Sequence, residues 1–432
     1  MLRREFCLFV ALLMSISALG LRCEAQVHEE ETLSGSNRHE LGPMMQPHLL
    51  GNWGGRRSQL EEHGLDLDLQ YVADHLWNVR SPERDRFASW NRFRGTVDLD
   101  LDRLAHWHDT YFHATAVWQA GGNLGQYLGL LTSPSGMSSA NTFRLDSWWL
   151  EKRYRHDRVI GRVGQFAAQD FYGVQHYGAS FIFEPMGYAL GNLVTTYESY
   201  DPPSTPALEL RVAPLSHAYI KSMVFAADRF PYSHNPTGLV PQFRGAVMNV
   251  SEIGFSPGQN AGALRGFDNV ETRKGYTGLY KFGAAYNPGK FTRPTSNVPR
   301  AGDYLLYWMA NQAIWRVDRS EAKGLDATVS YDWTPSDVNR NNSELTAGLR
   351  YNEPFPVPFH HTVSFGYVIN HLSSEFQTAG SPDFKLEHGF ELNSMLHVTP
   401  SLLVQPVVQY YVNVGGGTHT ALVAGLRTKI EF

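Results

Sequence analysis

The feature of this 432-residue chain that most constrains its fold is a period-two alternation of apolar and polar residues, which begins at Leu65. Residues 65–72 read LDLDLQYV, and residues 97–102 read VDLDLD. Successive side chains of a β-strand point to opposite faces, so each segment would have one wet face and one apolar face. The pattern recurs as far as Phe432 and does not fit the helices of a packed core.

The alternating segments predict about sixteen strands, with an allowance of two. Their expected bounds are 65–77, 92–104, 110–119, 143–155, 158–168, 207–213, 217–227, 246–255, 276–287, 303–316, 324–333, 343–352, 361–371, 388–398, 402–413 and 419–432. Short connections alternate with long ones, and the long ones include 79–91, 120–142 and 172–206. The connection 259–275 is an exception, because it is long where a short one is due. An even number of amphipathic strands joined in this way indicates an all-β fold, a transmembrane antiparallel β-barrel.

The first 25 residues predict a cleaved secretory signal peptide. Arg3 and Arg4 precede an apolar run from Phe6 to Leu19, which at 14 residues is too short to span a bilayer as a helix. Cleavage after Ala25 leaves a polar, flexible lead-in (26–48) and a barrel domain (49–432). A lipoprotein signal ending at Cys23 is the alternative, which a preceding arginine disfavours.

Composition excludes several classes of function. The only cysteines, Cys7 and Cys23, lie in the signal, so the mature chain would have no disulfide scaffold, thiol nucleophile or cysteine-bound zinc. Cleavage removes three arginines and two glutamates, which takes the net charge from -5 to -6, and a mildly acidic chain is not a general nucleic-acid binder. Metalloprotease, nucleophile-elbow and P-loop motifs are missing, and His106 and His108 are expected to form a surface pair. We therefore expect no enzyme, no cofactor and no metal.

The last predicted strand carries an apolar stripe that finishes on an aromatic residue. Leu422, Ala424, Leu426, Ile430 and Phe432 share one face, and Arg427, Lys429 and Glu431 share the other. Outer-membrane barrels commonly present such a strand to the barrel assembly machinery. We expect Phe432 to be that assembly signal, with outer-membrane lipid against the apolar stripe.

Several motifs, in order, resemble the carbohydrate-selective porins of the OprB type. The segment 50–57 (LGNWGGRR) looks like the opening motif of that family, with Asn52 where an aspartate is usual. LDSWWLE at 145–151 and RVGQ at 162–165 resemble its next strand pair, and VQP at 404–406, followed by GLR at 425–427, resembles its ending. Val407 stands where the family usually has an aspartate. The resemblance covers nearly all of the mature chain.

The resemblance implies a channel in the cell outer membrane for passive diffusion of small carbohydrates, either monomeric or homotrimeric. A general porin for small polar solutes is the first alternative. An outer-membrane lipase would need a serine–histidine pair to which nothing in the sequence points, and a soluble periplasmic glycan-binding β-protein would leave the membrane without detergent.

Porins of this architecture fold a long loop inward, and the longest connection here, 172–206, follows the strand that carries Arg162. The pore-lining or constriction candidates combine charged, polar and aromatic side chains that can bind sugar hydroxyls and ring faces: Glu151, Arg153, Arg162, Gln165, Asp170, His176, Tyr177, Glu184, Tyr188 and Glu198. A solvated surface loop is the alternative reading.

Trp148 and Trp149 are adjacent on a predicted strand, so they face opposite sides. One would face lipid in an aromatic girdle, and the other is a candidate sugar-stacking platform in the lumen. The charges of Glu151, Arg153 and Arg162 either set an electrostatic field across the lumen or stiffen its wall.

Overall fold

The computed structural model describes residues 47–81, 86–189, 204–228, 230–257, 276–293, 295–318, 322–376 and 385–432. The predicted signal peptide, most of the predicted lead-in, Glu198 and the connection 259–275 lie outside these residues. No helix within the described ranges is both long and apolar enough to cross a membrane.

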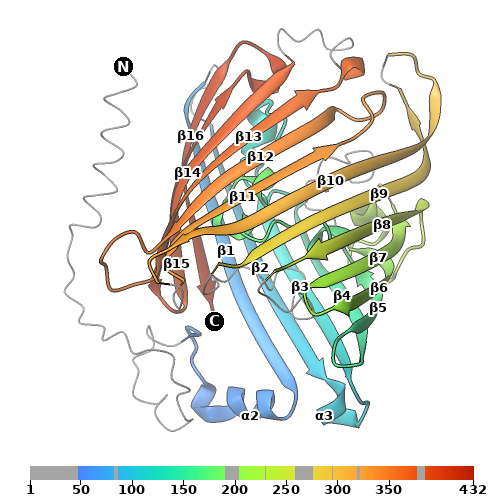
Figure 1. Ribbon diagram of the computed structural model, residues 1–432, viewed down its shortest axis with the longest axis vertical. Helices are drawn as coiled ribbons and strands as arrows, with labels where there is room; N and C mark the ends of the chain where they lie inside the picture. The colour runs from blue at the N-terminus through green and yellow to red at the C-terminus, as the bar shows by residue number, and fades with distance from the viewer. Residues whose placement is uncertain are drawn as a thin grey trace.

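Sixteen antiparallel strands, each hydrogen-bonded to its neighbours in sequence, close into one barrel in which β1 pairs with β16 (Figure 1). The strands are β1 (Leu65–Arg80), β2 (Phe87–Asp100), β3 (Thr110–Gly121), β4 (Thr142–Tyr154), β5 (Val159–Phe166), β6 (Thr205–Leu215), β7 (Ala218–Ala227), β8 (Ala246–Phe255), β9 (Gly278–Thr292), β10 (Pro299–Arg316), β11 (Gly324–Trp333), β12 (Asn341–Asn352), β13 (His361–Leu372), β14 (Leu386–Thr399), β15 (Leu402–Val412) and β16 (Thr420–Glu431). The predicted fold class and strand number are confirmed.

The predicted bounds of the second strand, 92–104, were wrong at both ends, because β2 spans Phe87–Asp100. Residues 101–105 form helix α3 (Leu101–Ala105), because the Asp100 side chain accepts hydrogen bonds from the main-chain nitrogens of Asp102 and Arg103 and so caps the helix. At the other end β2 begins at Phe87, so most of the predicted loop 79–91 is strand. Charged residues between positions 80 and 86 conceal the alternation there.

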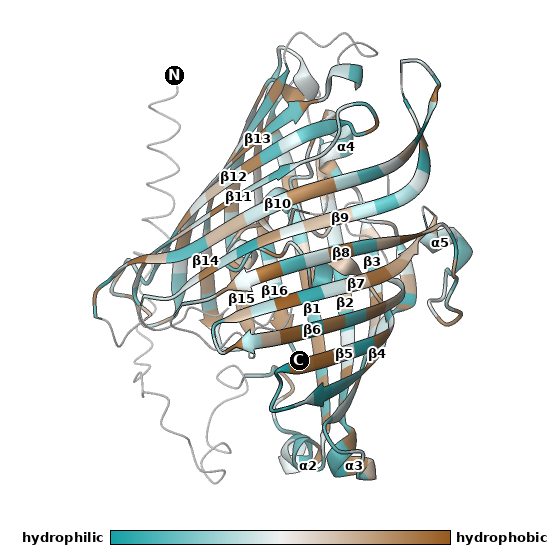
Figure 2. Ribbon diagram, turned by 45° about the vertical axis from the view of Figure 1, so that its right-hand side comes forward, coloured by the Kyte–Doolittle hydropathy of each residue, from teal (hydrophilic) through white to brown (hydrophobic). Residues whose placement is uncertain are grey.

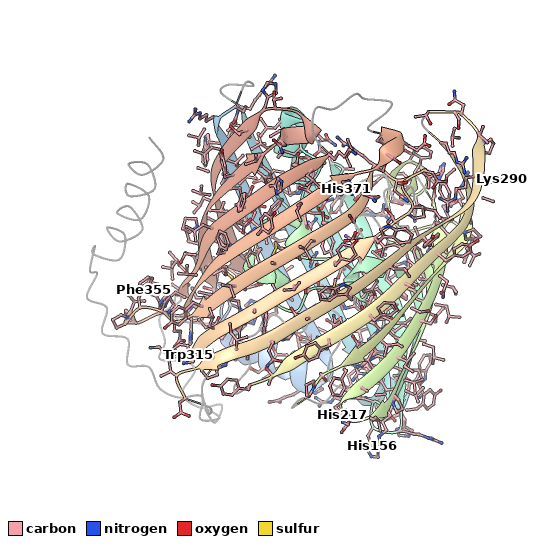
Figure 3. All side chains as sticks on the ribbon, turned by 45° about the horizontal axis from the view of Figure 1, so that its top comes forward. His156, His217, Lys290, Trp315, Phe355 and His371 are labelled. Carbon is pink, nitrogen blue, oxygen red and sulfur yellow. The ribbon has the colours of Figure 1, made fainter. Side chains whose placement is uncertain are left out.

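The two ends of the barrel differ. Figure 3 shows the turns with His156, His217 and Phe355 at one end, and Lys290 and His371 at the other. Helices α2 (Arg56–Glu62) and α3 lie at the first end, which we call the short-turn end (Figure 1). In bacterial barrels short turns face the periplasm and long loops face outward.

The outer wall is apolar and the interior is polar. Phe143, Leu208 and Val247 have exposed fractions of 76%, 55% and 68% on the outside, whereas Gln405 and Gln409 are buried inside. Apolar and polar residues accordingly alternate along the strands in Figure 2. This distribution matches a barrel with lipid outside and a polar lumen.

Candidate solute path

Two loops fold into the barrel and divide its interior. The first inward loop (122–141) connects β3 to β4 and carries helix α4 (Leu124–Leu128). The main-chain nitrogen of Leu131 donates to both carboxylate oxygens of Glu387, at 3.0 and 3.1 Å. The Ser135 hydroxyl donates to Asp74 at 2.6 Å. These bonds fix the loop to β14 and β1.

The second inward loop (167–189) follows β5 and crosses the lumen. Near its start, the Gly173 nitrogen donates to Glu252 on β8 at 2.9 Å, and the Lys281 ammonium on β9 donates to the Val174 carbonyl at 2.7 Å. Farther along, Glu391 on β14 accepts bonds from the nitrogens of Ile182 and Phe183 at 2.9 and 2.8 Å. The predicted inward fold of this segment is therefore present over residues 172–189.

Three glycines on the inner faces of β12, β13 and β14 make room for this loop. A Cβ atom at Gly348 would lie 2.7 Å from Met186 Cε, and one at Gly389 would lie 2.5 Å from Phe183 Cζ. A Cβ at Gly366 would lie 3.0 Å from the Phe181 ring. The apolar side of the loop therefore packs directly on the barrel wall.

The two loops also bind each other. Gly136 donates its main-chain hydrogen to the Ile182 carbonyl at 3.0 Å, and the Tyr188 hydroxyl donates to the Gly136 carbonyl at 3.0 Å. The first loop is tied to β1, β2 and β14, and the second to β8, β9 and β14. A cavity lies along the inner face of β1–β4.

Two adjoining cavities form a candidate solute path through the interior. The larger, which we call the vestibule, has a volume of about 770 Å³ and is lined from Glu61 at the short-turn end to Gln119 deeper inside. The smaller, the constriction cavity, has a volume of about 210 Å³ and is lined mainly by the two inward loops. Arg92, Arg94 and Asp170 line both cavities, so they mark the passage between the two.

The two arginines at this junction differ in their contacts. Arg92 is buried, and it donates to Gln119 Oε1 at 2.9 Å and to the Met137 carbonyl at 3.3 Å, which ties the first inward loop to the wall. Within the described part of the chain, the half-buried Arg94 makes no hydrogen bond or ion pair. Its guanidinium is therefore available to a solute.

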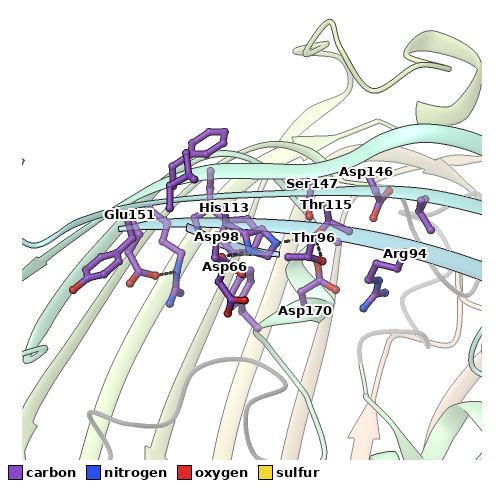
Figure 4. A pocket seen from close by; sticks show the side chains of 18 of the residues that line it. Asp66, Arg94, Thr96, Asp98, His113, Thr115, Asp146, Ser147, Glu151 and Asp170 are labelled. Carbon is purple, nitrogen blue, oxygen red and sulfur yellow. Dashed lines mark hydrogen bonds and ion pairs between the residues drawn. The ribbon is translucent and has the colours of Figure 1, made fainter. Parts of the chain in front are cut away.

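The charged residues that the sequence predicted to line the pore, Glu151, Arg153 and Arg162, form a largely buried network on the vestibule wall. Arg162 donates to Glu151 at 2.6 Å and to Glu209 at 2.8 Å, and Arg153 also pairs with Glu151. The Arg153 guanidinium lies over the Tyr111 ring. Both predicted readings, a field across the lumen and a stiffened wall, fit this arrangement. Figure 4 shows Glu151 at one side of the cavity and Arg94 at the other.

The adjacent tryptophans face opposite sides of β4. Trp149 lines the vestibule, whereas Trp148 lies in an apolar groove on the outer wall. The His113 ring stacks on Trp149 with centroids 3.8 Å apart, and the rings of Phe166 and Phe171 meet it edge to face. Trp149 is therefore rigidly held and only part of its surface faces the lumen.

The remaining candidates divide into two groups. His176, Glu184 and Tyr188 line the constriction cavity together with Asp170. Gln165 and Tyr177 line neither cavity.

The two that lie off the path are buried by other segments. Gln165 donates to the Gly238 carbonyl at 3.0 Å and accepts from Asn235 at 3.0 Å, so it holds the loop between β7 and β8. The Arg350 guanidinium lies over the Tyr177 ring, with its Cζ atom 4.2 Å from the centroid of that ring.

Glu184 is enclosed where the two loops meet. Its main-chain nitrogen donates to the Ser133 carbonyl at 3.2 Å. Burial raises the pKa of its carboxyl group to about 8, and the carboxylate of Asp332 adds to the shift. The buried site therefore favours the neutral, hydrogen-bonding form of this side chain.

Sequence reasoning missed Arg92, Arg94 and the inward course of the first loop. Arg92 and Arg94 occupy alternate positions at the start of a predicted strand, and this spacing places both on one face. Two basic residues on the polar face of an amphipathic strand are a signal that could have singled them out.

A closed barrel with a polar lumen narrowed by inward loops defines a diffusion channel of the outer membrane. The model of the family "Carbohydrate-selective porin, OprB family" matches residues 85–432, and the chain belongs to that family. The chain is 24% identical to Porin B of Pseudomonas aeruginosa, over 98% of this chain and 97% of that protein. It is also 24% identical to the putative porin QuiX of Acinetobacter baylyi, over 89% and 93% of the two chains.

A solved structure has the same fold. The high-pH structure of Pseudomonas putida OprB superposes with a TM-score of 0.81 at 20% identity, over 90% of this chain and 99% of that one. The predicted family, outer-membrane location and porin function are thereby confirmed.

Proposed function

We propose that small sugars cross this porin through the constriction cavity and the vestibule, and pass between Arg94 and Asp170. The observation that carries the proposal is that these two side chains line both cavities, and that Arg94 has no partner among the described residues. A sugar hydroxyl can accept from the guanidinium and donate to the carboxylate at the same time.

Passage needs no chemical step and no coupled energy source. Selectivity would come from the width of the path and from the hydrogen-bonding groups along it. The part of Trp149 that faces the vestibule would add an apolar contact for the C–H face of a sugar ring.

A general porin for small polar solutes is the second candidate, and the second inward loop, anchored to β8 and β9 at one end and to β14 at the other, disfavours it because it narrows the lumen. Swelling of liposomes that contain the purified protein separates the two. We expect a monosaccharide to enter faster than an amino acid of similar mass, and a trisaccharide to be excluded. Equal rates for the first two solutes would indicate a general porin, and no entry of any solute would contradict the channel.

We also propose that Phe432 serves as the assembly signal. Its ring lies 5.9 Å from the Phe93 ring, whose side chain is exposed on the outer wall. Phe432→Ala should lower the amount of assembled barrel, measured as the heat-modifiable gel band, and leave single-channel conductance unchanged. Normal assembly of the variant would count against this role.

A further inference from the structure

The opening motif, residues 50–57, takes no part in the solute path, yet its backbone is unusual. Trp53, Gly54 and Gly55 have φ angles of 50°, 68° and 94°. A Cβ atom on either glycine would meet nothing within 4 Å, so the glycines serve the left-handed backbone and not a close contact. The turn they form lies directly before helix α2.

This turn places Arg57 against the junction of the first and last strands. The Asn52 side chain accepts from the Ser58 nitrogen at 3.0 Å and donates to the Ser58 hydroxyl at 2.9 Å, which fixes the start of α2. The Arg57 guanidinium lies 4.7 Å from the centroid of the Trp53 ring. Arg57 is only 4% exposed, whereas its neighbour Arg56 is exposed.

Arg57 contacts the junction at which β1 pairs with β16 and closes the barrel. Its Nη2 atom donates to the Leu67 carbonyl on β1 at 3.2 Å and to the main-chain oxygen of Phe432, which follows β16, at 2.9 Å. One side chain therefore bridges the first and last strands. Figure 1 shows α2 at the end of the barrel at which β16 finishes.

The strand register explains why a bridge is required there. The β1–β16 ladder starts at the pair Gln70–Glu431, and the Phe432 nitrogen donates to the Leu69 carbonyl at 2.8 Å. Residues 65–68 of β1 extend past this last rung, so their carbonyls on that edge have no strand partner. Unpaired edge groups of a strand cost stability unless another donor meets them.

We propose that the 50–57 motif stabilises the seam of the barrel, the junction at which β1 pairs with β16, and we call the motif the seam clip. It holds Arg57 as a hydrogen-bond donor that continues the β1–β16 ladder beyond the end of β16. Leu49 contributes in the same way, because its main-chain nitrogen donates to the Glu431 carbonyl at 2.8 Å. Arg57 is thus a positioning residue for barrel closure, and it lines neither cavity of the solute path.

Hydrogen–deuterium exchange of the full mature protein in detergent tests the seam clip. Arg57→Met keeps the length of the side chain and removes the donor. We expect the amides of 65–72 and 424–432 to exchange roughly tenfold faster, since a hydrogen bond from a charged donor is lost at the seam. Exchange in β8 and β9, and single-channel conductance, should stay unchanged. Arg56→Met is the matched control and should exchange like the wild type.

Unchanged exchange at the seam in Arg57→Met would overturn the proposal, as would equal acceleration in every strand. If Arg57→Met does not assemble, Asn52→Ala provides the same test because it loosens the start of α2. Faster seam exchange in that variant would support the seam clip, and wild-type exchange would overturn it.

Discussion

At the scale of single residues, side chains that are open to the cavities lie next to side chains that hold the structure. Arg94 and Arg92 are two positions apart on β2 and face the same way. The guanidinium of Arg92, however, donates hydrogen bonds to Gln119 and to the first inward loop. The same division applies to Trp149 and Trp148, which lie on opposite faces of β4.

The tryptophan pair gives a matched prediction. Trp149→Ala should weaken sugar block of the ion current by roughly threefold to tenfold, as expected for loss of one aromatic contact. Trp148→Ala should leave the block unchanged because its side chain lies on the outer wall. Titration of a monosaccharide during single-channel recording measures both, and equal effects of the two substitutions would contradict the assignment.

Glu184 gives a prediction on pH. Its pKa rises from 4.5 to about 8 in the folded protein, so the folded state binds a proton more tightly than the unfolded state. This stabilisation is fully present below pH 4.5 and is lost as the pH rises towards 8. The unfolding temperature should fall between pH 5 and pH 9, and Glu184→Gln should reduce that fall. An identical pH dependence in wild type and variant would refute the assignment.

At the scale of elements, the alternation of side chains was enough to predict every strand, because one face of each strand meets lipid and the other meets water. It failed at α3, where Leu101 and Asp102 continue the alternation but Asp100 caps a helix. The inward loops were harder to predict, because their anchors are distant in sequence. The first loop binds Glu387 and the second binds Glu391, and no local pattern connects these residues to the loops.

Glu391 is the anchor that most directly tests the role of the second inward loop. Glu391→Ala would leave the main-chain nitrogens of Ile182 and Phe183 without their acceptor, at a cost of about 1–3 kcal/mol for each group. The loop should detach from β14, so single-channel conductance should rise and its fluctuations should increase. Glu353→Ala, at an exposed turn, is the control and should conduct like the wild type. Wild-type conductance in Glu391→Ala would place the loop outside the narrow part of the path.

At the scale of the whole molecule, a mildly acidic chain places Arg94, which has no partner among the described residues, at the junction of the vestibule and the constriction cavity. The closed sheet supplies the wall, the two inward loops cross the interior between β8 and β14, and the vestibule lies along β1–β4. The family resemblance was sufficient to predict a sugar channel, whereas the position of the path depends on loop contacts that only the folded structure brings together.

The central claim, that sugars pass between Arg94 and Asp170, is tested most directly by titrating a monosaccharide against the single-channel ion current of Arg94→Ala. Arg103→Ala is the matched control, since Arg103 also lines the vestibule but lies near its mouth and pairs with Asp100. The account predicts sugar block in the wild type, roughly tenfold weaker block in Arg94→Ala and unchanged block in Arg103→Ala. Wild-type block in Arg94→Ala would contradict it.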